Sequence, residues 1–456
     1  MRLSILPSWV GRASGQKDGE RALWPTPGFG YGLVKLEQAL GKSGCAVCRL
    51  AAEHDESYLY HVAWEGIDDP ASRSRLRASL GFCPRHTWLL YDLERRWWGD
   101  GLEIALLLDD AIRETIRRLR RAQHGRPPSL IDPHAGCLAC DARRAIEATY
   151  LVDISRGIAW PAFRTQYQQN GGLCLRHLQV LLQGSALSSP ASHLLADLAL
   201  EALDRARTAG NVSRLLDVLF GQEIPSELTD PSLSAGWIEA TVVTCPFCAR
   251  QREIDCTVMC DIPNEAALRD AADRTDLWAL CVRHIRALRR AATGPGGEAA
   301  IMPYDRAARQ WLSRIRRDGE LQRGLPAFTR RLVRRFWSRA DTGTSSTCPA
   351  CAIVVPTAEG AARSAAEALL ADSSIRRVPP TSFPCLRHLD QMLAAAPPED
   401  AARIARIAVD QLALLNGELQ EYIRKHRWEY RHEDRGTEQT SWIRATVFVA
   451  GERGVW

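Results

Sequence analysis

Apolar residues recur at helical spacing along most of this chain. Between residues 399 and 426, those from Ile404 to Leu419 follow one another at steps of three to five positions, with acids and arginines on the other face. Residues 101–122 repeat the pattern. Alternating patterns typical of strands occur only as short candidates at 241–245 and 445–451. The chain is therefore predicted to be mainly α.

Four copies of one cysteine and histidine arrangement run through these helical segments. Each copy is a C-x2-C pair followed, after 32 to 34 intervening residues, by a C-x2-H pair. The four copies are Cys45 and Cys48 with Cys83 and His86; Cys137 and Cys140 with Cys174 and His177; Cys245 and Cys248 with Cys281 and His284; and Cys348 and Cys351 with Cys385 and His388. Twelve of the 14 cysteines belong to this repeat.

The copies begin roughly 100 residues apart, which is the size of a small domain rather than of a solenoid repeat. We expect four related helical modules of about three helices each. Their predicted bounds are 1–128 with an N-terminal arm, 129–228, 229–340, and 341–456 with a C-terminal tail. Proline and glycine gather at 124–136, 221–236 and 339–347, as expected for segments that join modules.

Three thiolates and one imidazole are a common ligand set of structural zinc. Two residues between ligands allow one turn to present both side chains to a single ion. We expect each module to bind one zinc ion, about four per chain, with its own C-x2-C and C-x2-H pairs as ligands. The ion would then staple two helix starts some 33 residues apart. The alternative cofactor for such a ligand set is an iron–sulfur cluster.

Four protein ligands close a zinc site to water and substrate, which favours a structural ion over a catalytic one. The chain has no phosphate-binding loop, dinucleotide fingerprint or nucleophile elbow. The sequence thus favours a scaffold or adaptor for a protein partner over an enzyme. It also has no secretory signal pattern and no apolar run long enough for a membrane span, so we expect a cytoplasmic protein without a membrane partner.

The C-x2-C and C-x2-H pairs, together with the tail at 419–451, resemble an uncharacterised family of bacterial cytosolic proteins with repeated CPxC and GFCxxH pairs. The resemblance implies that the cysteines and histidines of the four copies are metal ligands. In the first two copies, alanine or leucine replaces the proline of CPxC, a position that ligates nothing. The family has no assigned activity, so the resemblance leaves function open.

Two further features have more than one interpretation. Cys256 and Cys260 lie outside the repeat and could be a redox pair, alternative ligands or ordinary core residues. An arginine precedes each motif histidine, at positions 85, 176, 283 and 387. These arginines could face an anion or the thiolates, or could simply share a solvated helix position.

The net charge of +5 is small and the basic residues are almost all arginine. Arginine-dense stretches at 117–126, 286–290 and 330–339 lie near aromatic residues and could contact nucleic acid. A nucleic-acid-binding regulator is therefore the alternative to the scaffold. An iron–sulfur or thiol redox protein is the second alternative.

Overall fold

The computed structural model describes residues 31–123, 129–132, 135–184, 189–222, 245–261, 280–292, 297–318, 348, 350–351, 354, 360–364, 366–367, 370, 383–453 and 455. Its α-helices are α1 (Tyr31–Leu40), α2 (Ala46–Trp64), α3 (Pro70–Ala78), α4 (Pro84–Trp97), α5 (Leu102–Ala122), α6 (Leu138–Gly157), α7 (Pro161–Gln169), α8 (Leu175–Gly184), α9 (Ser189–Thr208), α10 (Val212–Phe220), α12 (Pro246–Asp261), α14 (Val282–Ala292), α15 (Gly297–Asp318), α18 (Leu386–Ala395), α19 (Pro398–Lys425) and α20 (Ser441–Ala450). A 3-10 helix, η4 (Thr437–Thr440), leads into α20.

The mainly α prediction is confirmed, since the described residues contain helices and no strand. The strand candidate at 445–451 is wrong, because this segment forms most of α20. Every residue of α20 is buried, so neighbours on all sides override the strand preference of its valines and threonine. Of the other candidate, 241–245, residues 241–244 lie outside the described residues. None of the described helices is long and apolar enough to cross a membrane.

The first two sequence copies contain more helices than the three expected. Residues 46–122 form α2 to α5, and residues 138–220 form α6 to α10. The additional short helices α3 and α7 occupy equivalent places, and each begins with a proline, whose fixed φ suits the first helical turn. Each of these helices leads into the C-x2-H pair of its copy.

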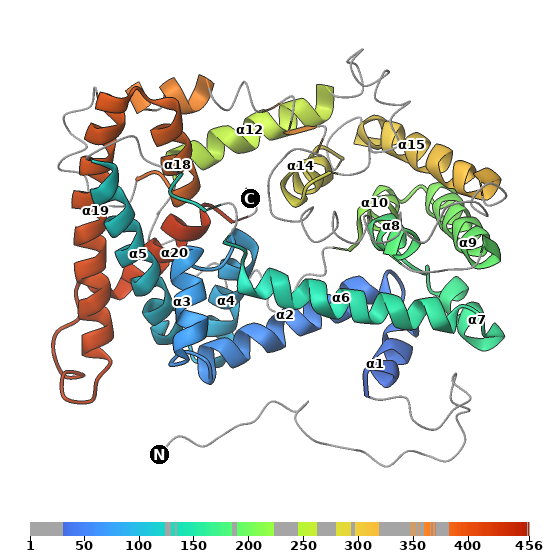
Figure 1. The fold of residues 1–456 in the computed structure, drawn as a ribbon, viewed down its shortest axis with the longest axis horizontal. Coiled ribbons are helices and arrows are strands. Elements are labelled where there is room, and N and C mark those ends of the chain that lie inside the picture. The colour runs from blue at the N-terminus through green and yellow to red at the C-terminus, as the bar shows by residue number, and fades with distance from the viewer. Residues whose placement is uncertain are drawn as a thin grey trace, which may run out of the picture.

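Two hydrophobic cores organise the described chain. One is formed by α1, α7 to α10, α14 and α15, and the other by α3 to α5 and α18 to α20. Helices α2 and α6 pack together and extend from one core into the other, as Figure 1 shows. Helix α2 begins in the first core at Ala46 and ends in the second at Ala63, whereas α6 runs from the second core to the first.

Each core thus contains residues from several of the predicted modules. Residues near Leu36, Leu195 and Ile301 share the first core, and residues near Leu59 and Leu412 share the second. The module bounds at 128, 228 and 340 remain a prediction, but the modules do not each enclose a private core.

The second core is built around α20. This helix lies between α4, α5 and α19 (Figure 1). Its Trp442 stacks on Tyr91 of α4 with ring centroids 5.0 Å apart. Trp442 also covers Gly101, the residue that precedes α5 and has a positive φ of 75°. A β-carbon at residue 101 would lie 2.6 Å from the indole ring.

Gly101→Ala should therefore lower the free energy of unfolding by about 2–5 kcal/mol, combining strain at positive φ with overlap against the buried indole. Gly99→Ala is the matched control, because Gly99 has a φ of 79° but nothing within 4 Å of the added carbon. It should cost only the backbone strain, about 1–2 kcal/mol. Urea unfolding of both variants measures the difference, and equal losses would contradict the role assigned to Trp442.

Candidate metal centres

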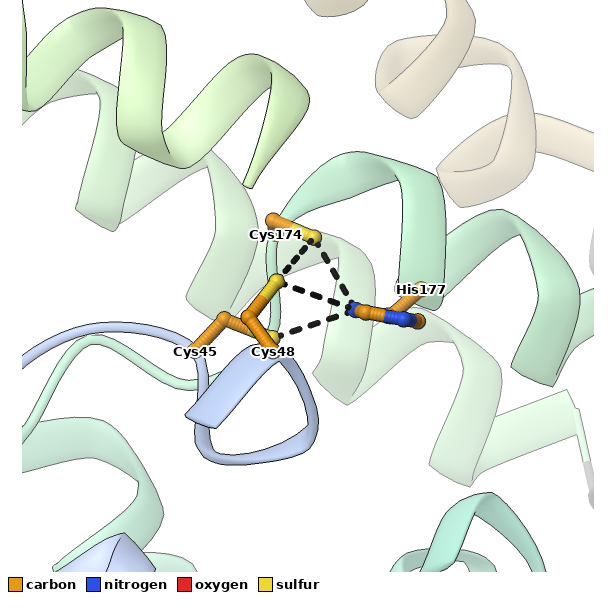
Figure 2. A group of neighbouring side chains, drawn as sticks. All are labelled: Cys45, Cys48, Cys174 and His177. Carbon is orange, nitrogen blue, oxygen red and sulfur yellow. Dashed lines mark hydrogen bonds between the residues drawn. The ribbon is translucent and has the colours of Figure 1, made fainter. Parts of the chain in front are cut away.

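The sixteen motif residues gather into four groups, each with three cysteines and one histidine. The ligand atoms of each group lie within 4.8 Å of one another. Cluster 1 is Cys45, Cys48, Cys174 and His177; cluster 2 is Cys83, His86, Cys137 and Cys140; cluster 3 is Cys245, Cys248, Cys385 and His388; cluster 4 is Cys281, His284, Cys348 and Cys351. Figure 2 shows cluster 1, with two cysteines from the start of α2 and the other two ligands from the start of α8.

The pairing of segments differs from the sequence-based expectation. No C-x2-C pair meets the C-x2-H pair of its own copy. In clusters 1 and 3 the C-x2-C pair of one copy meets the C-x2-H pair of the next copy. In clusters 2 and 4 the C-x2-H pair of one copy meets the C-x2-C pair of the next copy. The pairing is nested, and each half of the chain holds an inner and an outer cluster. The expected staple over about 33 residues is therefore wrong, because helix packing brings together segments more distant in sequence.

The distances within each cluster suit one tetrahedral ion. In each cluster, two of the sulfurs lie 3.6 to 3.9 Å apart. The histidine Nδ1 lies 3.2 to 3.7 Å from the sulfurs. Zinc–sulfur bonds of about 2.3 Å and zinc–nitrogen bonds of about 2.0 Å in a tetrahedron give edges of about 3.8 and 3.5 Å. The four groups therefore have both the donors and the spacing of a Cys3His metal site.

The first cysteine opens a helix in seven of the eight motif pairs, those for which the structure describes the helix start. Cys45, Cys83, Cys137 and Cys385 occupy N-cap positions without forming a side-chain cap, and the other described motif helices begin one residue after their cysteine. The thiol is thereby free to face the cluster. The positive end of each helix dipole also points toward it, which stabilises thiolates. The expected helix at each C-x2-H pair is confirmed, and the first three C-x2-C pairs open helices as well.

Backbone groups approach the sulfurs closely. In cluster 3, the amide of Cys385 donates to Cys245 Sγ over 3.3 Å, and the amide of Glu452 donates to Cys248 Sγ over 3.4 Å. In cluster 1, a β-carbon on Gly221 would lie 2.7 Å from Cys48 Sγ. The site therefore has room only for glycine at this position, which also has a φ of 87°.

Three thiols in such a small space affect one another's ionisation. Hydrogen bonds from Cys137 and Cys140 lower the pKa of Cys83 well below its ordinary value. The hydrogen bonds of Cys140 to Cys137 and Cys83 raise its own pKa strongly. Burial opposes a charged His86, but the Cys83 thiolate and Asp55 raise its pKa well above the usual range. One ionised thiol thus suppresses the next, and three thiolates require a bound cation.

Buried carboxylates face the far nitrogen of three motif histidines. Asp55 Oδ2 lies 3.4 Å from His86 Nε2, Glu147 Oε1 lies 3.5 Å from His177 Nε2, and Asp255 Oδ1 lies 3.7 Å from His284 Nε2. Such an acid fixes the ring orientation and the tautomer, leaving Nδ1 to the metal. The sequence analysis missed these residues. Their signal was a position, seven residues after the second cysteine, that is acidic in the first three copies and Ala358 in the fourth.

In the first and third copies, the arginine before the motif histidine forms an ion pair with this carboxylate. Arg85 pairs with Asp55 at 3.2 Å, and Arg283 binds Asp255 through two hydrogen bonds of 2.7 Å. In the second copy, burial disfavours an ionised Glu147, but His177, Arg143 and Arg176 together lower its pKa. Arg85 and Arg283 therefore face an anion, and that anion is the carboxylate beside the motif histidine.

Cys256 belongs to none of the four clusters. It is half-buried on α12, and the side chain of Cys260 lies outside the described part of the chain. The structure thus adds no thiol or ligand role to Cys256.

The described arginines of the dense stretches are largely engaged within the protein. Arg118 binds Glu114 and the carbonyl of Leu130, and Arg289 binds Asp217 and the carbonyl of Gly221. The stretch 330–339 and residues 124–126 lie outside the described residues.

An exposed group of rings lies on the surface near the end of α2. Tyr60 and Trp64 both stack on Trp98, with centroid distances of 5.5 and 6.1 Å. We call these three residues the aromatic stack. Trp64 is 46% exposed, so the stack offers an apolar and rigid surface to solvent.

No family model and no solved structure matches this chain. Among curated proteins, one from Caldicellulosiruptor sp. (strain Rt8B.4), described as an uncharacterised 23.9 kDa protein in the xynA 3' region, is 25% identical over 161 residues. The match covers 33% of this chain and 71% of the relative. This distant similarity and the four clusters are consistent with a cysteine–histidine repeat protein of unknown function.

A fifth polar group consists of carboxylates alone. Glu94, Asp100 and Glu103 place oxygens within 4.8 Å of one another between α4 and α5. Glu94 is fully buried, and its Oε2 accepts from the amide of Ile104 at 3.3 Å. Burial, followed by the neighbouring Glu103, raises the pKa of Glu94 to about 9. Glu94 is therefore protonated at neutral pH.

Because the folded state keeps this proton and the unfolded state releases it above the ordinary glutamate pKa, stability should fall as pH rises from about 4.5 to about 9. Glu94→Gln removes this dependence. Its free energy of unfolding should exceed that of the wild type by roughly 1 kcal/mol or more at pH 9 and converge with it at pH 5. Urea unfolding across this range tests it, with Glu53→Gln, an exposed α2 position, as control. A pH-independent difference would be inconsistent with a buried neutral Glu94.

Proposed function

We propose that this chain is a structural zinc protein that holds four ions in Cys3His sites and presents its helical surfaces to a protein partner. The observation on which the proposal rests is the assembly of all sixteen motif residues into four clusters of one composition. Tetrahedral sites with three thiolates and one imidazole are typical of structural zinc.

A structural role is supported by the burial of the ligands. All four residues of clusters 1 and 3 are buried, and the motif histidines of clusters 2 and 4 are fully enclosed. Four protein ligands complete the tetrahedron, so substrate or water has no coordination position. The separation of the sulfurs favours a single ion over an iron–sulfur cluster, in which iron and sulfide ions would lie between the cysteines.

Zinc loading also changes the electrostatic argument for nucleic acid. Each ion with three thiolates contributes a net charge of −1, so four sites lower the formal charge of +5 to about +1. The engaged arginines described above leave less free positive charge than the sequence suggests. A protein partner that contacts the aromatic stack is the better-supported interpretation.

Metal analysis of paired variants tests both the ions and their nesting. The wild type should contain about four zinc ions per chain. Cys48→Ser combined with Cys174→Ser, both in cluster 1, should remove one ion. Cys48→Ser combined with Cys83→Ser, which share a sequence copy but not a cluster, should remove two. Mass spectrometry of elements in protein purified without an affinity metal gives the counts.

If Cys48→Ser with Cys174→Ser removed two ions and Cys48→Ser with Cys83→Ser removed one, the ligand pairs of each sequence copy would bind the same ion, and the nested pairing would be contradicted. Bound iron with a brown colour would support the iron–sulfur alternative, and a wild type with fewer than two metal ions would reject the proposal.

The partner proposal is tested by affinity capture with two exposed tryptophan variants. Trp64→Ala changes the aromatic stack, whereas Trp428→Ala changes a more exposed ring beyond the end of α19. A protein retained by the wild type and by Trp428→Ala, but weakened by about 2 kcal/mol or more in Trp64→Ala, is the expected result. Recovery that requires nucleic acid, together with steeply salt-dependent heparin binding, would favour the nucleic-acid regulator instead.

A further inference from the structure

Clusters 1 and 2 are connected by the antiparallel helices α2 and α6. Helix α2 begins at cluster 1 with Cys45, and α6 begins at cluster 2 with Cys137. Each helix then presents, about three turns later, the carboxylate that faces the histidine of the opposite cluster. Asp55 of α2 contacts His86 of cluster 2, and Glu147 of α6 contacts His177 of cluster 1. The helix that begins at each cluster therefore supplies the carboxylate for the histidine of the other cluster.

One side chain joins the two carboxylates. Arg143, on α6 one turn after Cys140, donates through Nη1 to Asp55 Oδ2 and through Nε to Glu147 Oε1 at 2.7 Å. Asp55 has a fully buried side chain, and those of Arg143 and Glu147 are 15% and 14% exposed. The fixed fork of a guanidinium holds two acceptors in defined directions. Arg143 therefore fixes the position of one acid relative to the other.

We propose that clusters 1 and 2 form one coupled metal-binding unit, in which Arg143 is the positioning residue for both histidines. This inference rests on the proposed zinc binding. An ion in cluster 1 fixes the start of α2 and hence Asp55, which orients His86 for the second ion. An ion in cluster 2 fixes the start of α6 and hence Glu147, which orients His177. Loading of either site preorganises the other.

The second half of the chain has a different arrangement. Asp255 of α12 faces His284 and is bound by Arg283 and by Gln251, which occupies the register of Arg143. The position that corresponds to Glu147, seven residues after the second cysteine, is Ala358 in the fourth copy. Among the described residues, Arg143 is the guanidinium that joins two acids each facing a motif histidine, so the effect of Arg143 should be confined to two of the four ions.

Release of zinc to a chromophoric chelator measures this coupling in the full-length chain. Arg143→Gln should accelerate the release of two ions per chain by about 10- to 100-fold, the usual effect of losing a group that orients a metal ligand. The other two ions should leave at the wild-type rate. Arg144→Gln is the matched control, because Arg144 is the next residue on α6 and pairs with Asp141 at the protein surface. It should leave all four rates unchanged.

Asp55→Asn provides a second test, because Asp55 contacts only the histidine of cluster 2. Coupling predicts faster release of two ions, whereas independent sites predict one.

Acceleration of no ion, of one ion or of all four in Arg143→Gln would overturn the coupling. If circular dichroism shows that Arg143→Gln is unfolded, Arg143→Lys keeps the charge without the fork and must show the same two-ion effect. A wild type that holds no zinc rejects the proposed function itself, whereas four ions with unaltered release reject only the coupling.

Discussion

The nested pairing of ligand segments is the constraint on which the rest of the structure depends. The outer cluster of the first half joins Cys45 to His177, and the inner cluster joins Cys83 to Cys140. In the structure both clusters form while α2 and α6 lie side by side in opposite directions. A structural zinc ion contributes of order 10 kcal/mol, comparable with the net stability of a whole domain. Metal binding at these clusters would therefore be thermodynamically linked to the packing of these two helices.

This arrangement also places the ligands in the hydrophobic cores: Cys45, Cys48 and Cys174 of cluster 1 belong to the first core, and Cys137 of cluster 2 packs against the second. Helices α2 and α6 each begin in one core and end in the other, and the ligands occupy their first turns. The helix starts direct their dipoles at the sulfurs, while residues further along each helix face the other cluster. Helices α2 and α6 thus each supply two cysteines to one cluster and a carboxylate that faces the histidine of the other cluster.

The electrostatic environment is organised in layers around three of the motif histidines. The thiolates approach Nδ1, a carboxylate faces Nε2, and an arginine faces the carboxylate, as in the sequence His86, Asp55 and Arg85. Alternating charges allow each buried group to remain ionised without an uncompensated neighbour. The same order of groups recurs around His284, so it belongs to the repeat and not to one local environment.

The sequence alone determined the helical class, the sixteen cluster residues and the helix that starts at each C-x2-H pair. These features are local: ligands two residues apart share a turn, and apolar residues at helical steps share a face. Which pair meets which was decided by tertiary structure, because within-copy and nested pairing have identical local spacing and differ only in how α2 packs on α6. For the same reason, α20 reads as a strand at 445–451 until its burial on every side is known. Asp55, Glu147 and Asp255 look like ordinary helix acids until folding places each one opposite a histidine.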